Sequence, residues 1–138
     1  MRTARITPIV LALLMAAGCG GSPEDVHATY SPVPDARLFA QVRELPGVTR
    51  AHVFYASDFN GKGYYGNVWV RRGVDARKTL DRVFAILWQG RPEAAIGSPI
   101  EVDRLGKPLV SALDLGLKSY SDWVKRYGPQ PGDGKPPA

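Results

Sequence analysis

The N-terminus of the chain has the order of charged, apolar and small residues that an export signal requires. Arg2 and Arg5 supply the positive charge, residues 9–15 form an unbroken apolar run, and residues 16–18 are Ala, Ala and Gly. This order is typical of a secretion signal, which is removed from the mature protein. The apolar run is too short to cross a hydrocarbon core, which takes about 20 apolar residues. We therefore predict that residues 1–18 are a signal peptide and that only the rest of the chain folds.

Cys19 follows this segment directly. The residues around it read AAGCGG, which resembles the lipobox of bacterial lipoproteins, although Ala16 stands where Leu or Val is commoner. The resemblance implies cleavage before Cys19, acylation of its thiol, and attachment to the extracytoplasmic face of the cell membrane. The sequences LPGV, ILWQGRP and RYGPQP are also similar to those of small uncharacterised lipoproteins of high-GC bacteria, a likeness that implies no activity. The alternative is an ordinary secretion signal that happens to end at a cysteine.

Composition limits what the mature chain can do. Removal of residues 1–18 leaves 120 of the 138 residues, which suits one domain, and lowers the formal charge from +5 to +3. This excess favours anionic surroundings but is too small to indicate nucleic-acid binding. Cys19 is the sole cysteine, and His27 and His52 have no metal-ligand spacing, so we predict no disulfide, metal site or cofactor.

Two segments have the apolar spacing of amphipathic helices. The first lies within residues 34–47, with Asp35 as its predicted cap, and the second within 76–90, with Asp75 as its cap. Gly90 and Pro92 end the second helix. The apolar faces consist of Leu38, Phe39, Val42 and Leu45 in the first helix and Leu80, Val83, Phe84, Leu87 and Trp88 in the second.

Three segments alternate apolar and polar residues, as strands packed on one side do. They are residues 48–56, 64–71 and 98–103, and the first two are joined by a turn around Asn60 and Gly61 that favours a hairpin. The third strand turns Glu101 and Asp103 outward. The predicted inward residues are Ala51, Val53, Tyr55, Val68, Val70, Ile100 and Val102.

This order of elements predicts an α+β fold of the ferredoxin-like kind, with two helices on one face of an antiparallel sheet. The pattern is βαββαβ if residues 26–30 form a short first strand, and αββαβ otherwise. We expect a signal peptide (1–18), a lipidated tether (19–34), one domain (35–127) and a disordered tail (128–138). The C-terminal extension, residues 105–138, is extra to that unit and contains a possible strand at 109–113 and a short helix at 121–127, capped by Ser119 or Ser121.

The outward face of the predicted hairpin combines aromatic rings with cations. Rings and cations on an open sheet can stack planar groups and hold anions. We call this surface the hairpin face; its residues are Arg50, His52, Phe54, Tyr65, Asn67, Trp69 and Arg71. Three interpretations stay open: coverage by the apolar C-terminal extension, burial in a homodimer or against another protein, or a surface for a small ligand.

No recognisable catalytic motif or phosphate-binding loop is present. The sequence therefore favours a non-enzymatic envelope lipoprotein that binds a protein partner or an anionic envelope component. The alternative is a cell-envelope hydrolase or accessory enzyme that uses His52 with Asp58 or another carboxylate as an acid–base pair. A spacer without a ligand is a third hypothesis.

Overall fold

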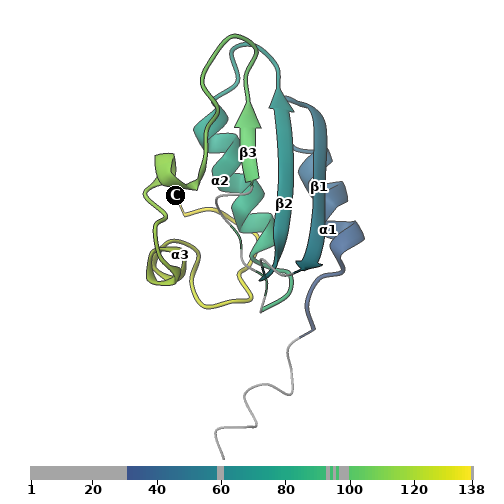
Figure 1. Cartoon of the computed structure of the whole chain (residues 1–138), viewed down its shortest axis with the longest axis vertical. Helices are drawn as coiled ribbons and strands as arrows, with labels where there is room; N and C mark the ends of the chain where they lie inside the picture. Colours follow the sequence, from purple (N-terminus) through teal and green to yellow (C-terminus); the bar gives the residue numbers. More distant parts are fainter. Residues whose placement is uncertain (1–30, 59–60, 93, 95, 97–99, 138) are drawn as a thin grey trace, which may run out of the picture.

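The computed structural model describes residues 31–137 except 59–60, 93, 95 and 97–99 (Figure 1). The predicted first strand at 26–30 and the signal and lipidation segment therefore lie outside the described residues. The elements follow one another in the chain as α1 (Asp35–Arg43), β1 (Val48–Asp58), β2 (Gly61–Val70), α2 (Ala76–Leu87), β3 (Ile100–Asp103), the 3-10 turn η2 (Ala112–Leu115) and α3 (Tyr120–Tyr127). The mixed α+β class is confirmed.

The described strands form one sheet in the order β1-β2-β3. The hairpin of β1 and β2 is antiparallel, as predicted, but β3 runs parallel to β2, with Gly66 opposite Ile100 and Trp69 opposite Asp103. The expectation of a wholly antiparallel sheet is therefore wrong. The physical reason is the long connection through α2, because a crossover of this length returns the chain to the starting end of β2. With three described strands, the ferredoxin-like arrangement is not confirmed.

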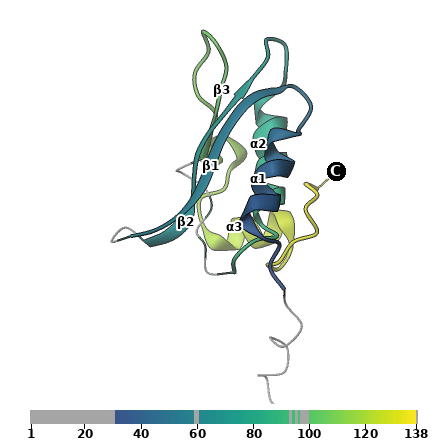
Figure 2. The ribbon, with the colours of Figure 1, turned by 90° about the vertical axis from the view of Figure 1, so that its right-hand side faces the viewer.

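Both predicted helices lie on the same side of the sheet, as Figure 2 shows. Asp75 caps α2 as expected, because its carboxylate accepts a hydrogen bond from the Lys78 N–H at 3.1 Å. All five residues of the predicted apolar face of α2 are buried, together with Val68, Ile100 and Val102 from the sheet. The core is thus a layer between the two helices and one face of the sheet.

Asp35 does not cap α1, contrary to the prediction. The helix begins after Pro34 without a side-chain cap, and the Asp35 carboxylate instead pairs with Arg91, 2.9 Å away, beyond the end of α2. The same carboxylate accepts a hydrogen bond from the buried Tyr64 hydroxyl at 2.9 Å. Burial, which opposes the charged phenolate, raises the pKa of Tyr64 well above its ordinary value. These contacts hold the N-terminal end of α1 against β2 and against the residues that follow α2.

The C-terminal extension packs against α2. The predicted strand at 109–113 shrinks to one antiparallel bridge between Val110 and Val102, after which η2 begins. The predicted helix is confirmed as α3, with Ser119 as its cap. The ring of Trp123 lies 4.8 Å from that of Phe84 and 5.6 Å from that of Trp88, measured between centroids. The extension therefore completes the helical layer.

A buried carboxylate links α3 to α2. Asp81 accepts two hydrogen bonds of 2.7 Å from the Arg126 guanidinium and one of 2.6 Å from the Tyr127 hydroxyl. Burial and the bond to Asp81 raise the pKa of Tyr127, so that hydroxyl stays protonated as a donor. The ion pair and hydrogen bonds of Asp81 thus hold α3 against α2 at a second point, in addition to the ring contact of Trp88 and Trp123.

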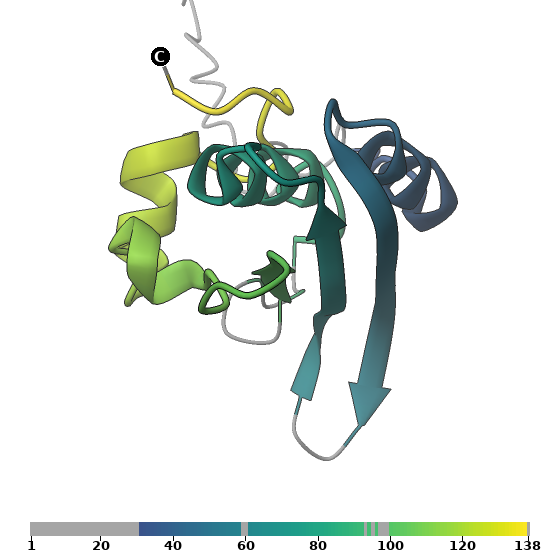
Figure 3. The ribbon, with the colours of Figure 1, turned by 90° about the horizontal axis from the view of Figure 1, so that it is seen from above.

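The segment beyond Tyr127, for which the sequence predicted disorder, makes hydrogen bonds in the structure. The Trp88 indole N–H donates to the Gly128 carbonyl at 3.1 Å, and the Gly132 N–H donates to the Trp88 carbonyl at 3.1 Å. Seen from above in Figure 3, the C-terminal segments lie beside β3 and α2. They do not form a layer over the hairpin face, so the first of the three interpretations of that face, coverage by the extension, is wrong.

Candidate functional site

The hairpin face is the side of the sheet that α1 and α2 leave uncovered (Figure 2). Arg50 and His52 are exposed, and 42% of the Phe54 surface is accessible. Tyr65, Asn67 and Trp69 on β2 are half-buried. Six of the seven predicted residues therefore lie together on β1 and β2, where strand alternation turns them away from the core.

The strand register arranges these side chains in rows across the sheet. Arg50 lies opposite Trp69, His52 opposite Asn67, and Phe54 opposite Tyr65. A bulge at the start of β1, between Val48 and Arg50, sets this register. Opposite residues on an antiparallel pair have Cβ atoms about 5 Å apart, which brings their side chains into contact.

The rings and cations of the hairpin face contact one another. The Arg50 guanidinium lies over the Trp69 ring, with its carbon 4.9 Å from the ring centroid. The Phe54 ring stacks on Tyr65 at 5.9 Å and lies 5.3 Å from the His52 ring, between centroids. Such contacts hold large side chains in place before a ligand arrives, which lowers the entropy that binding would remove.

Two acidic residues extend the face onto the third strand. Glu101 lies opposite Asn67 and Asp103 opposite Trp69, and both are half-buried, whereas Ile100 and Val102 point into the core. The face therefore has an arginine, an imidazole and a phenyl ring along β1, two rings and an amide along β2, and carboxylates along β3. Sequence reasoning turned Glu101 and Asp103 outward but did not join them to the site, because the parallel pairing of β3 was not predicted.

Arg71 is the seventh predicted residue. It follows the last residue of β2, and its N–H still donates to the Gly47 carbonyl at 2.9 Å. Its side chain lines a cavity at the end of the sheet together with Arg72, Arg104 and Lys107. Arg71 is therefore placed at the border between the hairpin face and that cavity.

The backbone of β1 holds His52 and Asp58, the proposed acid–base pair, far apart. The two residues stand six positions apart on one extended strand, which corresponds to about 20 Å at 3.3 Å per residue. Glu101 is two strands away from His52, about 10 Å across the sheet. This geometry gives the hydrolase hypothesis no support.

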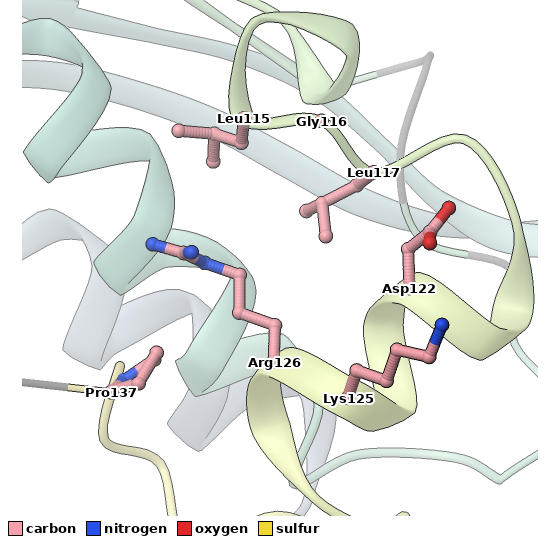
Figure 4. Close-up of a pocket in the computed structure, with 7 residues that line it drawn as sticks. All are labelled: Leu115, Gly116, Leu117, Asp122, Lys125, Arg126 and Pro137. Atoms are coloured by element: carbon pink, nitrogen blue, oxygen red, sulfur yellow. The ribbon is translucent and has the colours of Figure 1, made fainter.

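Two further features of the described residues bear on a metal or ligand site. In the described ranges, no three residues among His, Cys, Asp and Glu are grouped closely enough to hold a metal ion. A hollow of about 360 Å³ lies between residues 115–117 and α3 (Figure 4). Two of its polar residues already have structural roles: Arg126 binds Asp81, and Asp122 accepts the Ser119 hydroxyl and N–H. The hydrogen bond from the Ser119 hydroxyl has the largest effect on the pKa of Asp122. Together with the bond from the Ser119 N–H it lowers that pKa and keeps the Asp122 carboxylate ionised.

Comparison with known proteins adds no assignment: no protein-family model matches the chain, and neither do the curated proteins or the solved structures. Within the described part of the chain, no helix has both the length and the apolar character needed to cross a membrane. The site must therefore be interpreted from its own residues.

Proposed function

We propose that this protein is a non-enzymatic, lipid-anchored lipoprotein of the extracytoplasmic membrane face that binds a protein partner through its hairpin face. The observation that carries the proposal is the open sheet face with its ordered pairs of Arg50 with Trp69 and Phe54 with Tyr65. Tyr, Trp and Arg are the residue types that dominate binding energy at protein interfaces.

The charge pattern favours a protein over an anionic polymer as the occupant of this face. The β1 edge carries Arg50 and the β3 edge carries Glu101 and Asp103, so the face presents both signs of charge. A polyanion would be repelled along β3. A protein surface of mixed charge can complement both edges, and such complementarity gives specificity and orientation.

The placement of the helices also supports a binding role for the hairpin face. In a unit of that kind, two helices cover one face and leave the other free, as α1 and α2 do here. We propose that residues 31–137 are a shortened relative of this arrangement in which β3 pairs with β2 in parallel.

Acylation at Cys19 is tested by the variant Cys19→Ser. We expect the wild-type protein to fractionate with membranes and its N-terminal peptide to begin at a diacylglyceryl- and acyl-modified Cys19. The variant lacks the thiol that accepts lipid and should lose both properties, because stable anchoring needs two or more acyl chains. Mass spectrometry of the mature N-terminus makes the measurement. An unmodified thiol, or a chain that starts elsewhere, contradicts the anchor.

Partner binding is tested by photocrosslinking in the cells that make the protein. A photoreactive benzoylphenylalanine at position 54 should give a crosslinked species of defined mass. Arg50→Ala and Trp69→Ala should each weaken capture about 30-fold, the equivalent of about 2 kcal/mol for a central interface residue. The matched control Arg37→Ala changes an exposed arginine on α1 and should leave the crosslink unchanged.

Two outcomes contradict the partner proposal. One is an adduct that persists in both Arg50→Ala and Trp69→Ala while thermal unfolding shows those variants to be folded. The other is the same adduct from a probe at position 120, where the Tyr120 side chain is 65% exposed on α3, away from the hairpin face. An adduct with the mass of two copies of this chain would identify the partner as a second copy.

A further inference from the structure

A cavity of about 560 Å³ opens at the end of the sheet where β2 and β3 finish. Its walls are the connection from β2 to α2 and the loop that follows β3, both of which lie at the top of Figure 1. The start of α1, where Asp35 accepts a hydrogen bond from Tyr64 in the first part of β2, lies near the opposite end of the sheet. The lining residues are Val70, Arg71, Arg72, Gly73, Val74, Asp75, Arg104, Leu105, Gly106 and Lys107.

The lining carries four cationic side chains and one carboxylate. The cations are Arg71, Arg72, Arg104 and Lys107, and none of them forms an ion pair with a described residue. The carboxylate, Asp75, already accepts the Lys78 N–H as the cap of α2. The cavity therefore has an excess of positive charge that the described residues do not neutralise.

Arg104 has a further unused donor. One of its terminal nitrogens donates to the Pro108 carbonyl at 3.2 Å, whereas its Nε–H is buried and has no hydrogen-bond partner among the described residues. Buried donors in native proteins nearly always have partners. Arg104 therefore lines the cavity and keeps a donor that no described residue uses.

The residue types select the ligand chemistry. Guanidinium groups match the geometry of phosphate oxygens, and lysine adds a point charge. The volume lies in the range of about 300–1,000 Å³ that organic ligands occupy, so the cavity has room for more than an inorganic ion. Leu105, 93% exposed, stands between Arg104 and Lys107. An exposed leucine flanked by cations is suited to the boundary between the headgroups and the acyl chains of a bilayer.

We propose that this cavity binds the phosphate group of an anionic lipid headgroup, with Leu105 against the acyl region. The site is separate from the hairpin face except for Arg71. It is also compatible with the anchor, because a segment as long as residues 19–34 can span at most about 55 Å, at 3.4 Å per residue, and β1 is about 36 Å long. A second contact with the membrane would fix the orientation of the hairpin face above it.

The test titrates soluble lipids into the full chain purified in a nonionic detergent. The ligands are dihexanoyl phosphatidylglycerol, dihexanoyl phosphatidylcholine and glycerol phosphate, and calorimetry gives each Kd. We expect phosphatidylglycerol to bind most tightly and glycerol phosphate to bind more weakly. Arg72→Ala and Lys107→Ala should each raise both Kd values about tenfold, because each removes a charge-assisted contact. Arg37→Ala, on α1, is the matched control and should change neither.

Leu105→Ser separates the lipid from the phosphate. This variant should weaken phosphatidylglycerol binding severalfold and leave glycerol phosphate binding unchanged. Equal Kd values for phosphatidylglycerol and glycerol phosphate would overturn the lipid assignment, and tight binding of the zwitterionic phosphatidylcholine would overturn the charge argument. If none of the three ligands bound, the proposed site would be overturned. That result would have no bearing on partner capture by Arg50 and Trp69.

Discussion

Trp123→Ala is expected to lower the free energy of unfolding by about 4 kcal/mol, the usual cost of removing a large buried aromatic side chain. Trp123 is 6% exposed and packs its ring against Phe84 and Trp88 of the α2 region. Its removal leaves a cavity at the contact that holds α3 in the helical layer. Thermal unfolding should show a fall in Tm of roughly 20 °C, since each kcal/mol shifts a domain of this size by about 5 °C.

Tyr120→Ala is the control for this prediction. Tyr120 lies on the same helix and its ring is 5.8 Å from that of Trp88, but 65% of its surface is exposed. We expect a loss below about 1 kcal/mol, as for most surface substitutions. If Trp123→Ala cost no more than Tyr120→Ala, α3 would not be packed on α2, and the C-terminal extension would be free to cover the hairpin face.

Gly66→Ala is expected to lower the free energy of unfolding by about 3 kcal/mol or more, because it combines backbone strain with a clash. Gly66 lies in the middle of β2 with φ of +138°. A Cβ there would stand 1.9 Å from the His52 carbonyl oxygen and 2.9 Å from the Val53 Cα. The strands of the hairpin would have to separate, and the rows of the hairpin face with them. Denaturant unfolding measures the loss.

Gly116→Ala isolates the strain from the clash. Gly116 follows η2 with φ of +77°, but a Cβ there would meet no atom within 4 Å. Its expected cost is that of a left-handed residue alone, about 1–2 kcal/mol. Equal effects at the two glycines would mean that β1 and β2 are not pressed together at Gly66.

The local elements could be predicted from the sequence because their signals are local. The spacing of Leu80, Val83 and Phe84 defines the buried face of α2, and Asp75 caps it as its position suggests. The hairpin and its outward residues follow from alternation, which has a fixed period of two. The prediction at Asp35 failed because its partner Arg91 is 56 positions away and competes for the carboxylate.

The relations between distant segments could not be predicted in the same way. Alternation turns Glu101 and Asp103 outward but does not say which strand β3 joins or in which direction, and the parallel pairing with β2 decides that they border Asn67 and Trp69. The cavity at the end of the sheet also combines two loops, around Arg72 and Lys107, that are brought together only by that pairing. The predicted strand at 109–113 is reduced to Val110, which alone pairs with β3.

The central claim is that the hairpin face is open in the isolated protein and occupied in the cell, and oxidative footprinting tests it most directly. Hydroxyl radicals label exposed aromatic side chains in the purified protein and in intact cells, and mass spectrometry compares them. We predict that Phe54, Tyr65 and Trp69 are labelled in the purified protein and protected in cells, whereas the buried Trp88 and Trp123 are protected in both. Equal labelling of Phe54 and Trp69 in the two samples, or their protection in the purified protein, would contradict the claim.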